Sequence, residues 1–542
     1  MQTKYIFVVG GVMSSVGKGI ATASIAKILQ SRGFPVSTIK CDMYVNIDAG
    51  TIRPTEHGEV FVGQDGIEAD QDLGNYERFT GIPSTRENYI TTGQVYQTVI
   101  RKERNMEYKG EDVEVVPDIP NEIIRRIKQA SAKDKAQITI VELGGTVGEY
   151  QNLLFLEAAR MMRLKNPQDV LFVMVSYLPV PSKVGEMKTK PTQHAVRCLN
   201  SAGIQADFIL GRSDKPLDKK RKEKLSMFCG MPIENVISAP DVDSIYEVPI
   251  NFEKEKLSEK ILSKFNLEPK KANLEDWGEL VDKIKNIKKE VKIAVVGKYF
   301  ATGSFILADS YISVIEAIKH ACWANDVKPT LTWVDSEKFE EDPSSVETLN
   351  QYDAIIVPGG FGSRGIEGII TSIKYARQNN IPFLGLCYGM QLAVIEFSRN
   401  MAGMSDANSV EINQDTKHPV IDLMEEQKKN MQESNYGATM RLGNYPCSFV
   451  KGTLAQKCYD KEHVLERHRH RYEFNNKYLD LLKSKGLVIA GINKKQNLVE
   501  IVELKEHPFF VGVQFHPEFN SRPLEPHPLF FNLIKSAVNR QK

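Results

Sequence analysis

The sequence lacks the features of several specialised protein classes. It carries almost no net charge, because 70 lysines and arginines face 69 aspartates and glutamates. No overall electrostatic field therefore favours nucleic acid or an anionic membrane surface as a partner. The seven cysteines show no C-x-x-C spacing, which argues against a disulfide framework or a structural zinc site. We expect a reducing, cytoplasmic location, and any anionic substrate must be held by local groups.

Targeting segments and long apolar runs are also lacking. Met1–Gly10 has neither the charged start nor the long apolar stretch of a signal peptide. Runs such as Val170–Val175 are far too short to cross a bilayer. With 42% hydrophobic and 26% charged residues, the composition is that of a soluble globular protein. A length of 542 residues predicts more than one domain.

Two α/β halves are predicted, each opening with an apolar strand that runs into glycine: Tyr5–Val9 and Ile293–Val296. Further short apolar runs are continuous rather than alternating, which is typical of mostly parallel sheets covered on both faces. These runs are Val36–Ile39, Ile138–Val141, Val170–Val175 and Phe208–Leu210, then Ala354–Val357, Phe383–Leu386 and Phe509–Val513. We predict an α/β fold with a P-loop-like domain (1–267), a docked helical linker (268–290) and a second domain (291–542).

A glycine-rich loop, Gly10–Gly19, joins the first predicted strand to the helical run Ala21–Leu29. Its backbone N–H groups and the helix N-terminus suit phosphate oxygens, and Lys18 adds a positive charge. The spacing departs from the usual P-loop, since Val12 replaces the first glycine and Gly19 replaces the Ser or Thr that follows the lysine. A plain strand–helix connection is the alternative, but the strand, doubled serine and helix together favour phosphate binding.

Because Gly19 offers no hydroxyl, a magnesium ion at this loop would need carboxylate ligands. Asp72 lies in the acidic stretch Glu68–Gly74, and Glu142 ends a predicted strand just before two glycines. From the residue types alone, each acid could equally be a solvated surface group.

The second half contains a G-x-C-x-G sequence centred on Cys387, at the end of a predicted strand. This pattern is typical of a nucleophile elbow, in which helix-terminal N–H groups stabilise a thiolate. A buried structural cysteine is the alternative, although such a cysteine rarely lies between two glycines. His516 ends another strand and could act as the base, with Glu518 orienting its imidazole. The loop Val357–Gly362 could complete an oxyanion hole.

Five motifs, in order along essentially the whole chain, resemble those of CTP synthases. They are residues 10–19, His57–Val62, Asp72–Gly74, Glu142–Gly148 and Lys188–Gln193. The region around Cys387, His516 and Glu518 likewise resembles a class I glutamine amidotransferase. The resemblance implies an enzyme that makes CTP from UTP, ATP and glutamine.

The resemblance also implies specific site residues. For ATP these are Ser15, Val16, Gly17, Lys18, Gly19, Ile20 and Asp72, with Pro240, Asp241 and Val242 near adenine. For UTP and CTP they are Ser14, Lys188, Thr189, Lys190, Pro191, Thr192, Gln193 and Lys224. For glutamine they are Gly360, Tyr388, Gly389, Met390, Gln391, Glu411 and Arg471. Asp72 and Glu142 would bind Mg²⁺, and Cys387, His516 and Glu518 would be catalytic.

The implied reaction has two parts. Cys387 attacks the glutamine amide and releases ammonia, while ATP phosphorylates O4 of UTP. Lys18, Lys40 and Mg²⁺ would offset charge on the transferring phosphoryl group. Ammonia must then reach the UTP site unprotonated, and the resemblance places the gate of a closed passage around Pro54, His57 and Val60.

Regulation and assembly are implied in the same way. Leu423–Leu442 resembles a lid over the glutamine site that responds to the activator GTP, with Phe361 and Arg364 as contacts. A homotetramer is expected. The family usually has Asp-Ile-Glu where this chain has Glu149, Tyr150 and Gln151, so inhibition by CTP is expected to be weaker here.

Two other functions remain open from the residues. One is a different ATP-dependent amidotransferase, such as a cobyric acid-type synthetase, against which Lys188–Gln193 argues. The other is a non-catalytic nucleotide switch or filament protein, against which the set Cys387, His516 and Glu518 argues. No nucleic acid or membrane partner is expected.

Overall fold

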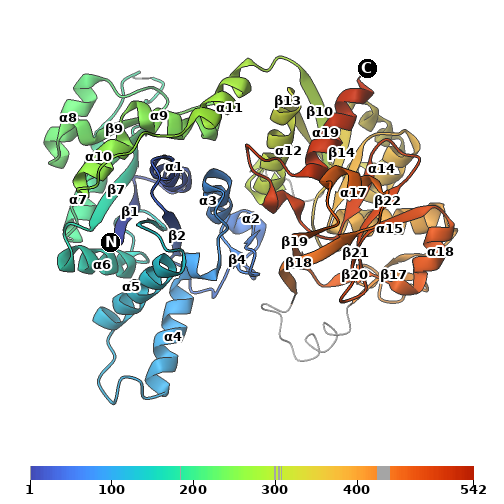
Figure 1. Cartoon of the computed structure of the whole chain (residues 1–542), viewed down its shortest axis with the longest axis horizontal. Helices are drawn as coiled ribbons and strands as arrows, with labels where there is room; N and C mark the ends of the chain where they lie inside the picture. The colour runs from blue at the N-terminus through green and yellow to red at the C-terminus, as the bar shows by residue number, and fades with distance from the viewer. Residues whose placement is uncertain are drawn as a thin grey trace. The chain divides into compact units, whose positions relative to one another are not determined.

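The chain forms two compact units in the computed structural model shown in Figure 1. The structure describes residues 2–183, 185–297, 301–302, 305–306, 308–423 and 440–541. The first unit comprises Met1–Ala49 and Asp72–Val281, and the second comprises Gly50–Gln71 and Asp282–Lys542. Among the described residues, no helix combines the length and the apolar character needed to cross a membrane.

The first unit is built on a seven-stranded sheet in the order β5-β2-β6-β1-β7-β8-β9, with every neighbouring pair parallel. The strands are β1 (Lys4–Gly11), β2 (Val36–Asp42), β5 (Tyr89–Thr91), β6 (Ile138–Leu143), β7 (Val170–Tyr177), β8 (Phe208–Ser213) and β9 (Val236–Pro240). Alternate side chains of β1 enter two different cores, Phe7 one and Ile6 the other. Burial on both faces explains why the strands are continuously apolar.

Helices cover both faces of this sheet. One core includes side chains of α1 (Lys18–Ser31), α9 (Val248–Lys254) and α10 (Leu257–Lys264). The other includes side chains of α4 (Thr92–Arg104), α5 (Val115–Lys133), α6 (Leu153–Lys165), α7 (Lys190–Ser201) and α8 (Lys219–Cys229). The helix α3 (Asp72–Thr80) packs on α1. The α/β class expected from the sequence is therefore confirmed.

The second unit contains a nine-stranded sheet in the order β13-β10-β14-β15-β23-β22-β21-β18-β19. The first five strands are parallel: β13 (Lys328–Asp335), β10 (Glu290–Gly297), β14 (Ala354–Val357), β15 (Phe383–Leu386) and β23 (Phe510–Val513). The other four pair antiparallel: β22 (Leu498–Leu504), β21 (Leu487–Asn493), β18 (Arg441–Phe449) and β19 (His463–His470). The sheet is thus mixed, and the apolar runs predicted from the sequence for this half all lie in its parallel part.

Helices again form two layers. Side chains of α12 (Ile312–Ala324), α17 (Leu454–Tyr459) and α19 (Pro528–Arg540) share one core. Those of α13 (Glu337–Glu341), α14 (Ile366–Gln378), α15 (Tyr388–Asn400) and α18 (Leu479–Ser484) share the other. Small elements complete the unit: β16 (Asn408–Ser409), β17 (Pro419–Leu423), β20 (Tyr472–Phe474), and the hairpin of β3 (Phe61–Val62) with β4 (Glu68–Ala69).

Two segments of the chain connect the two units. Gly50–Gln71, which includes α2 (Pro54–His57), belongs to the second unit although it lies early in the chain. The helix α11 (Glu275–Asn286) lies within the expected linker, and its Trp277 donates from Nε1 to the carbonyl of Tyr246 over 2.7 Å. The start of that linker helix is therefore docked on the first unit.

Candidate active sites

Cys387 lies at a sharp turn between β15 and α15. Its backbone has φ 50° and ψ −98°, a strained conformation for a residue with a side chain. The neighbouring glycines allow the turn, because a Cβ on Gly385 would lie 2.7 Å from the Gly389 carbonyl oxygen and one on Gly389 would lie 2.3 Å from that of Val357. Since α15 begins at the next residue, its N-terminal amides lie beside the sulfur.

His516 follows β23 and is held by an acid and an aromatic ring. Its Nδ1 lies 2.7 Å from Oε1 of Glu518, and Phe519 stacks on the imidazole with 5.4 Å between ring centroids. Burial lowers the pKa of His516, but the negative charges of Glu518 and Cys387 outweigh it and raise the pKa to about 10. An imidazolium is thus favoured, which stabilises a thiolate and can protonate a leaving amine.

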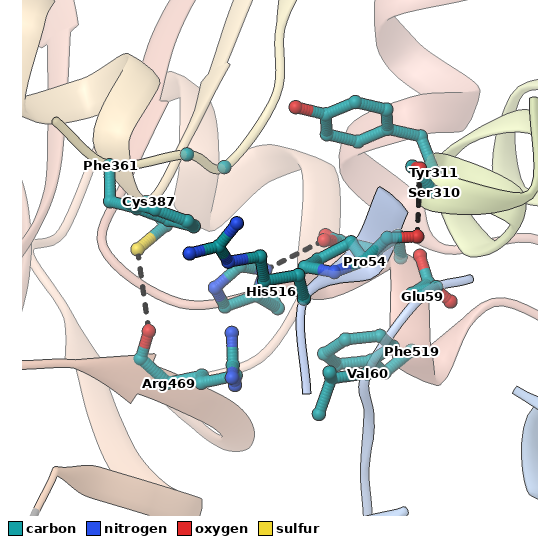
Figure 2. Close-up of a pocket in the computed structure, with 14 residues that line it drawn as sticks. Pro54, Glu59, Val60, Ser310, Tyr311, Phe361, Cys387, Arg469, His516 and Phe519 are labelled. Atoms are coloured by element: carbon teal, nitrogen blue, oxygen red, sulfur yellow. Dashed lines mark hydrogen bonds and ion pairs between the residues drawn. The ribbon is translucent and has the colours of Figure 1, made fainter. Parts of the chain in front are cut away.

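A cavity of about 490 Å³ holds this pair (Figure 2). Cys387, His516 and Glu518 line it together with the loop residues Gly359, Gly360 and Phe361. The rest of the wall is Arg53, Pro54, Glu59, Val60, Ser310, Tyr311, Arg469 and Phe519. The close-up shows the Cys387 sulfur directed towards the Arg469 carbonyl oxygen, 3.9 Å away.

The residues expected to bind glutamine surround the same loop. Tyr388 donates from its hydroxyl to the Gly362 carbonyl over 2.7 Å, and the Gly362 N–H donates to Glu411 over 3.0 Å. On the other side, Gln391 donates from Nε2 to the Tyr472 carbonyl over 2.9 Å. These contacts hold the loop that contains Gly360 next to the turn at Cys387.

Arg471 and Met390 complete the expected glutamine set. Burial raises the pKa of Tyr472, the charge of Glu411 raises it further, and the Arg471 guanidinium opposes both, so the two charges share one neighbourhood. The side chain of Met390 is fully buried in the core, so only its backbone can face a ligand.

In the first unit, the glycine loop joins β1 to α1 with Gly17 at φ 90° as the helix N-cap. Lys18 bends back and donates to the Gly145 carbonyl over 2.9 Å. Burial lowers the pKa of Lys18, while the charge of Glu142 opposes that shift. The loop therefore brings a buried amine and a helix N-terminus to the end of the parallel sheet, where ligands of such sheets bind.

Asp72 and Glu142 converge on Lys40. The Lys40 ammonium lies 3.0 Å from Oε1 of Glu142 and also contacts Oδ2 of Asp72, while Tyr76 donates from its hydroxyl to Glu142. A Cβ on Gly19 would lie only 1.8 Å from Oδ1 of Asp72. The glycine that replaces the usual Ser or Thr is therefore what lets the carboxylate reach the loop.

These two carboxylates fit a magnesium ion. Mg²⁺ is commonly held by one or two carboxylates, with substrate phosphates and water completing the shell. Within the described ranges, no group of three or more His, Cys, Asp or Glu side chains is arranged to hold a metal. Asp72 and Glu142 would therefore act together with phosphate oxygens rather than as a closed protein cage.

A second cavity of about 200 Å³ adjoins the glycine loop. Gly17 and Ile20 line it together with Pro240, Asp241 and Val242, so the structure brings together these five of the residues expected around ATP. Arg212, at the end of β8, also lines it and forms an ion pair with Asp241. Arg212 is not among the residues predicted from the sequence, although its place at a strand end could have indicated it.

The residues expected around the pyrimidine nucleotide lie beside this loop. The helix α7 packs on the end of β1, since a Cβ on Gly11 would lie 2.7 Å from that of Ala195. Ser14 is exposed in the loop after β1. The buried Thr192 accepts a hydrogen bond from Ser176 over 2.8 Å, and Gln193 donates to Thr189 over 3.1 Å.

The basic members of this set gather around one acid. Lys188 lies 2.7 Å from Glu186, and the ammonium of Lys188 lowers the pKa of Glu186, with Arg221 and Lys224 adding to the effect. Lys190 begins α7 next to Pro191 and lies 5.5 Å from the ring centroid of Phe228. Lys188 and Lys224 thus share one electrostatic neighbourhood.

The remaining expected positions are distributed as follows. Glu149 accepts from the Thr146 N–H over 3.1 Å, whereas Tyr150 is 89% exposed and Gln151 is exposed. His57 lies 3.2 Å from Asp70, and Arg364 pairs with Glu337. The central part of the expected lid, residues 424–439, lies outside the described residues.

Two further side chains near the sites were not anticipated. Gln514 is fully buried and donates from Nε2 to the Cys387 sulfur over 3.8 Å. Tyr76 is also fully buried, and burial raises its pKa well above the ordinary value, with the charge of Glu142 adding to that shift. Neither was predicted from the sequence, although Gln514 lies only two residues before His516, because their contacts depend on tertiary packing.

Comparisons with known proteins match both halves of the chain. Residues 4–267 match the family model described as CTP synthase N-terminus, and residues 306–536 match the model of class I glutamine amidotransferases. The CTP synthase of Caldanaerobacter subterraneus is 50% identical over 539 residues, 99% of each chain. That of Sulfolobus acidocaldarius is 49% identical over 536 residues, 99% of this chain and all of the other. The glutaminase domain of Trypanosoma brucei CTPS, solved with bound acivicin, is 39% identical over 46% of this chain and 94% of its own, with a TM-score of 0.43.

Proposed function

Because the chain belongs to the CTP synthase family and is a glutamine-hydrolysing, CTP-forming ligase, we propose that it aminates UTP through a 4-phosphorylated UTP intermediate. The reaction uses two sites, one in each unit. Residues 1–267 provide the synthetase, residues 291–542 the glutaminase, and 268–290 the linker.

In the glutaminase site, the thiolate of Cys387 attacks the side-chain amide carbon of glutamine. Amides of Gly360 and of the elbow stabilise the oxyanion. The imidazolium of His516, held by Glu518 at 2.7 Å, gives its proton to the departing ammonia. The neutral imidazole then activates water to hydrolyse the thioester. Tyr388, Gly389, Met390, Gln391, Glu411 and Arg471 bind the glutamine.

In the synthetase site, the loop Ser15–Ile20 binds the phosphates of ATP, and the cavity lined by Pro240, Asp241 and Val242 takes the adenine. Ser14, Lys188–Gln193 and Lys224 bind UTP. Lys18 and Lys40 stabilise charge on the phosphoryl group as it passes to O4 of UTP. Asp72 and Glu142 would hold Mg²⁺, which supplies further neutralisation of phosphate charge when bound.

Ammonia leaves the glutaminase cavity past Pro54 and Val60, which line the same 490 Å³ space as Cys387. His57 lies in the helix between them and would act with them as a gate. Neutral ammonia keeps its lone pair only if the passage excludes acidic groups and bulk water. It then attacks C4 of the intermediate and displaces phosphate.

The proposal also covers regulation and assembly. GTP activates the enzyme at Phe361 and Arg364, and CTP inhibits it at the UTP site and at Glu149, Tyr150 and Gln151. The active form is a homotetramer. Large apolar side chains exposed on the first unit support an interface there: Val45, Ile47, Ile100, Met106, Val115 and Val116.

The shared cavity of Cys387, His516 and Pro54 carries the proposal, because it joins ammonia release to the segment that leads into Asp72. The test supplies ATP and glutamine with UTP or with other carboxyl and carbonyl acceptors, and follows ADP, glutamate and the aminated product. One ADP, one glutamate and one CTP per turnover with UTP alone are expected. ADP release with a different acceptor but not with UTP would reject the assignment.

A further inference from the structure

Gln514 directs a buried amide at the sulfur of Cys387. Its side chain is fully buried, and its Nε2 donates to that sulfur over 3.8 Å. The backbone on either side of this contact is fixed. The Cys387 N–H donates to the Val513 carbonyl over 2.7 Å, and the Gln514 N–H donates to the Glu500 carbonyl over 2.9 Å. The amide is therefore held beside the elbow by the sheet itself.

A second glutamine decides which end of the Gln514 amide faces the sulfur. Gln391 donates from Nε2 to the Tyr472 carbonyl over 2.9 Å, and the same nitrogen lies 3.5 Å from Oε1 of Gln514. Because an amide nitrogen carries two N–H donors, Gln391 can serve both acceptors. Oε1 of Gln514 thus faces Gln391, and the N–H donors of Gln514 lie at the end that faces Cys387.

The charged and titratable groups around the sulfur come from several elements. His516 and Glu518 follow β23 and form the pair described above. On β19, burial lowers the pKa of His468 and of His470 well below the ordinary value, so both imidazoles are neutral. Gln514 differs from all of these groups, because an amide donates a hydrogen bond at every pH without carrying a charge. The wall of the cavity adds the side chains of Arg53, Glu59, Tyr311 and Arg469.

A donor at this place distinguishes the two forms of the sulfur. The thiol of Cys387 donates to the Arg469 carbonyl over 3.9 Å, whereas a thiolate can only accept. A hydrogen bond to the charged form favours that form, and it is stronger than a bond between neutral groups. We propose that Gln514 is a catalytic residue whose amide N–H stabilises the thiolate of Cys387. This inference rests on the proposed function and adds a neutral donor to the roles of His516 and Glu518.

The thiolate occurs twice in the reaction cycle. It loses its charge when the S–C bond to glutamine forms and ammonia departs with the proton from His516. It returns when water adds to the thioester carbonyl, the S–C bond breaks and glutamate is released. Gln514 therefore maintains the attacking form of Cys387 and also stabilises the sulfur as a leaving group.

The test measures the rate at which iodoacetamide alkylates Cys387 as a function of pH. Labelling is read on the peptide that carries Cys387, because Cys198 is also exposed. Gln514→Met and Gln514→Leu both remove the N–H donor but differ in shape, and either decides alone if the other fails to fold. Asn493→Leu is the matched control, since it deletes a buried amide of the same sheet that donates to Gln496 over 3.1 Å.

We expect the acid limb of the alkylation profile to move to higher pH in both Gln514 variants. Alkylation on that limb should slow about tenfold, as expected for the loss of one hydrogen bond to a charged group. The alkaline plateau should not fall, because every Cys387 sulfur is then a thiolate, which is the reacting form. The acid limb of kcat/KM for glutamine hydrolysis should move in the same direction. Asn493→Leu should match the wild type in both profiles.

Two results would overturn the inference. One is an acid limb that stays in place in a folded Gln514 variant. The other is a plateau that falls while the acid limb does not move, which would leave Gln514 with a structural role only. A wild type that still hydrolyses glutamine after complete alkylation of Cys387 would instead reject the proposed function.

Discussion

At the scale of single residues, the two sites use charge in opposite ways. His516 is a buried base whose neighbours raise its pKa to about 10, so it retains its proton. Lys18 is a buried amine whose pKa is lowered by its surroundings. The first arrangement favours proton donation to a leaving group. In the second, a phosphate beside Lys18 would favour the ammonium and oppose the effect of burial.

Replacing Cys387 with alanine separates the two activities. Without the sulfur there is no thioester, so CTP formation from glutamine should fall to background. CTP formation from added ammonia should stay within about twofold of the wild type, because the first unit keeps all its own groups. The measurement is CTP released with each nitrogen source. A folded variant that has lost both activities would contradict the division of labour.

Glu518→Gln should change the pH dependence of glutamine hydrolysis. The charge of Glu518 raises the pKa of His516 against the effect of burial, so its removal lets burial dominate and lowers that pKa. The imidazolium is then lost at lower pH, and the alkaline limb of kcat/KM should move to lower pH. The rate itself should fall on the order of 10²-fold, as expected for impaired general acid–base catalysis. An alkaline limb that does not move would show that another group sets it.

Sequence patterns predicted roles for several of these residues but did not predict all of their partners. Cys387, His516 and Glu142 lie at or just after the ends of parallel strands, where the topology of such sheets gathers functional groups, whereas Asp72 begins α3. Arg212 and Gln514 also lie at or after strand ends, but their types are common in solvated loops. What distinguishes them is burial and contact, which depend on tertiary packing.

At the scale of elements, the turn from β1 into α1 packs closely against the start of α3. Gly19 leaves room for Asp72, and α3 begins at that residue. The continuous apolar runs predicted most parallel strands of both sheets, but not β5, β9 and β13 at the sheet edges. Strands β18, β19, β21 and β22 were not predicted. Polar residues interrupt β18, β19 and β22, and buried charges such as Arg441 and Glu500 lie on two of them, whereas the apolar run of β21 could have indicated a strand.

Asp72→Asn and Glu142→Gln test the metal assignment at this junction. Each keeps the shape of the side chain but removes a charge that would hold Mg²⁺. UTP-dependent ADP release should fall on the order of 10²-fold, the usual cost of a lost electrostatic stabiliser. Nucleotide-independent glutamine hydrolysis should continue. Near-normal ADP release at limiting Mg²⁺ in either variant would remove that residue from the set.

The loop between β6 and α6 offers a test of inhibition by CTP. Gln151 both donates and accepts hydrogen bonds, whereas a carboxylate only accepts, which suits a cytosine amino group. The double variant Tyr150→Ile, Gln151→Glu should bind CTP about tenfold more tightly, the equivalent of about 1.4 kcal/mol. The measurement is the inhibition constant of CTP in competition with UTP. Equal or weaker inhibition in the double variant would reject the idea.

At the scale of the whole molecule, assembly should depend on the nucleotides. Val45 is 75% exposed and Met106 is 66% exposed on the first unit, so both side chains are available to an interface with another subunit. If ATP and UTP bind between subunits, they stabilise the tetramer by mass action. Sedimentation velocity should show a shift to tetramers when both nucleotides are added. An unchanged monomer under those conditions would count against the assignment.

The route of the chain between the two units has a consequence for dissecting the enzyme. The chain passes from one unit to the other at Ala49–Gly50, at Gln71–Asp72 and at Val281–Asp282. A protease that cuts the linker therefore gives two polypeptides, and the C-terminal one stays attached only through its non-covalent packing with residues 50–71 of the other. Conversely, a recombinant fragment of residues 291–542 would leave Phe519 and Arg467 without Phe61 and Val62. Such a fragment would be an incomplete glutaminase, and adding back a peptide of residues 50–71 would be the way to restore it.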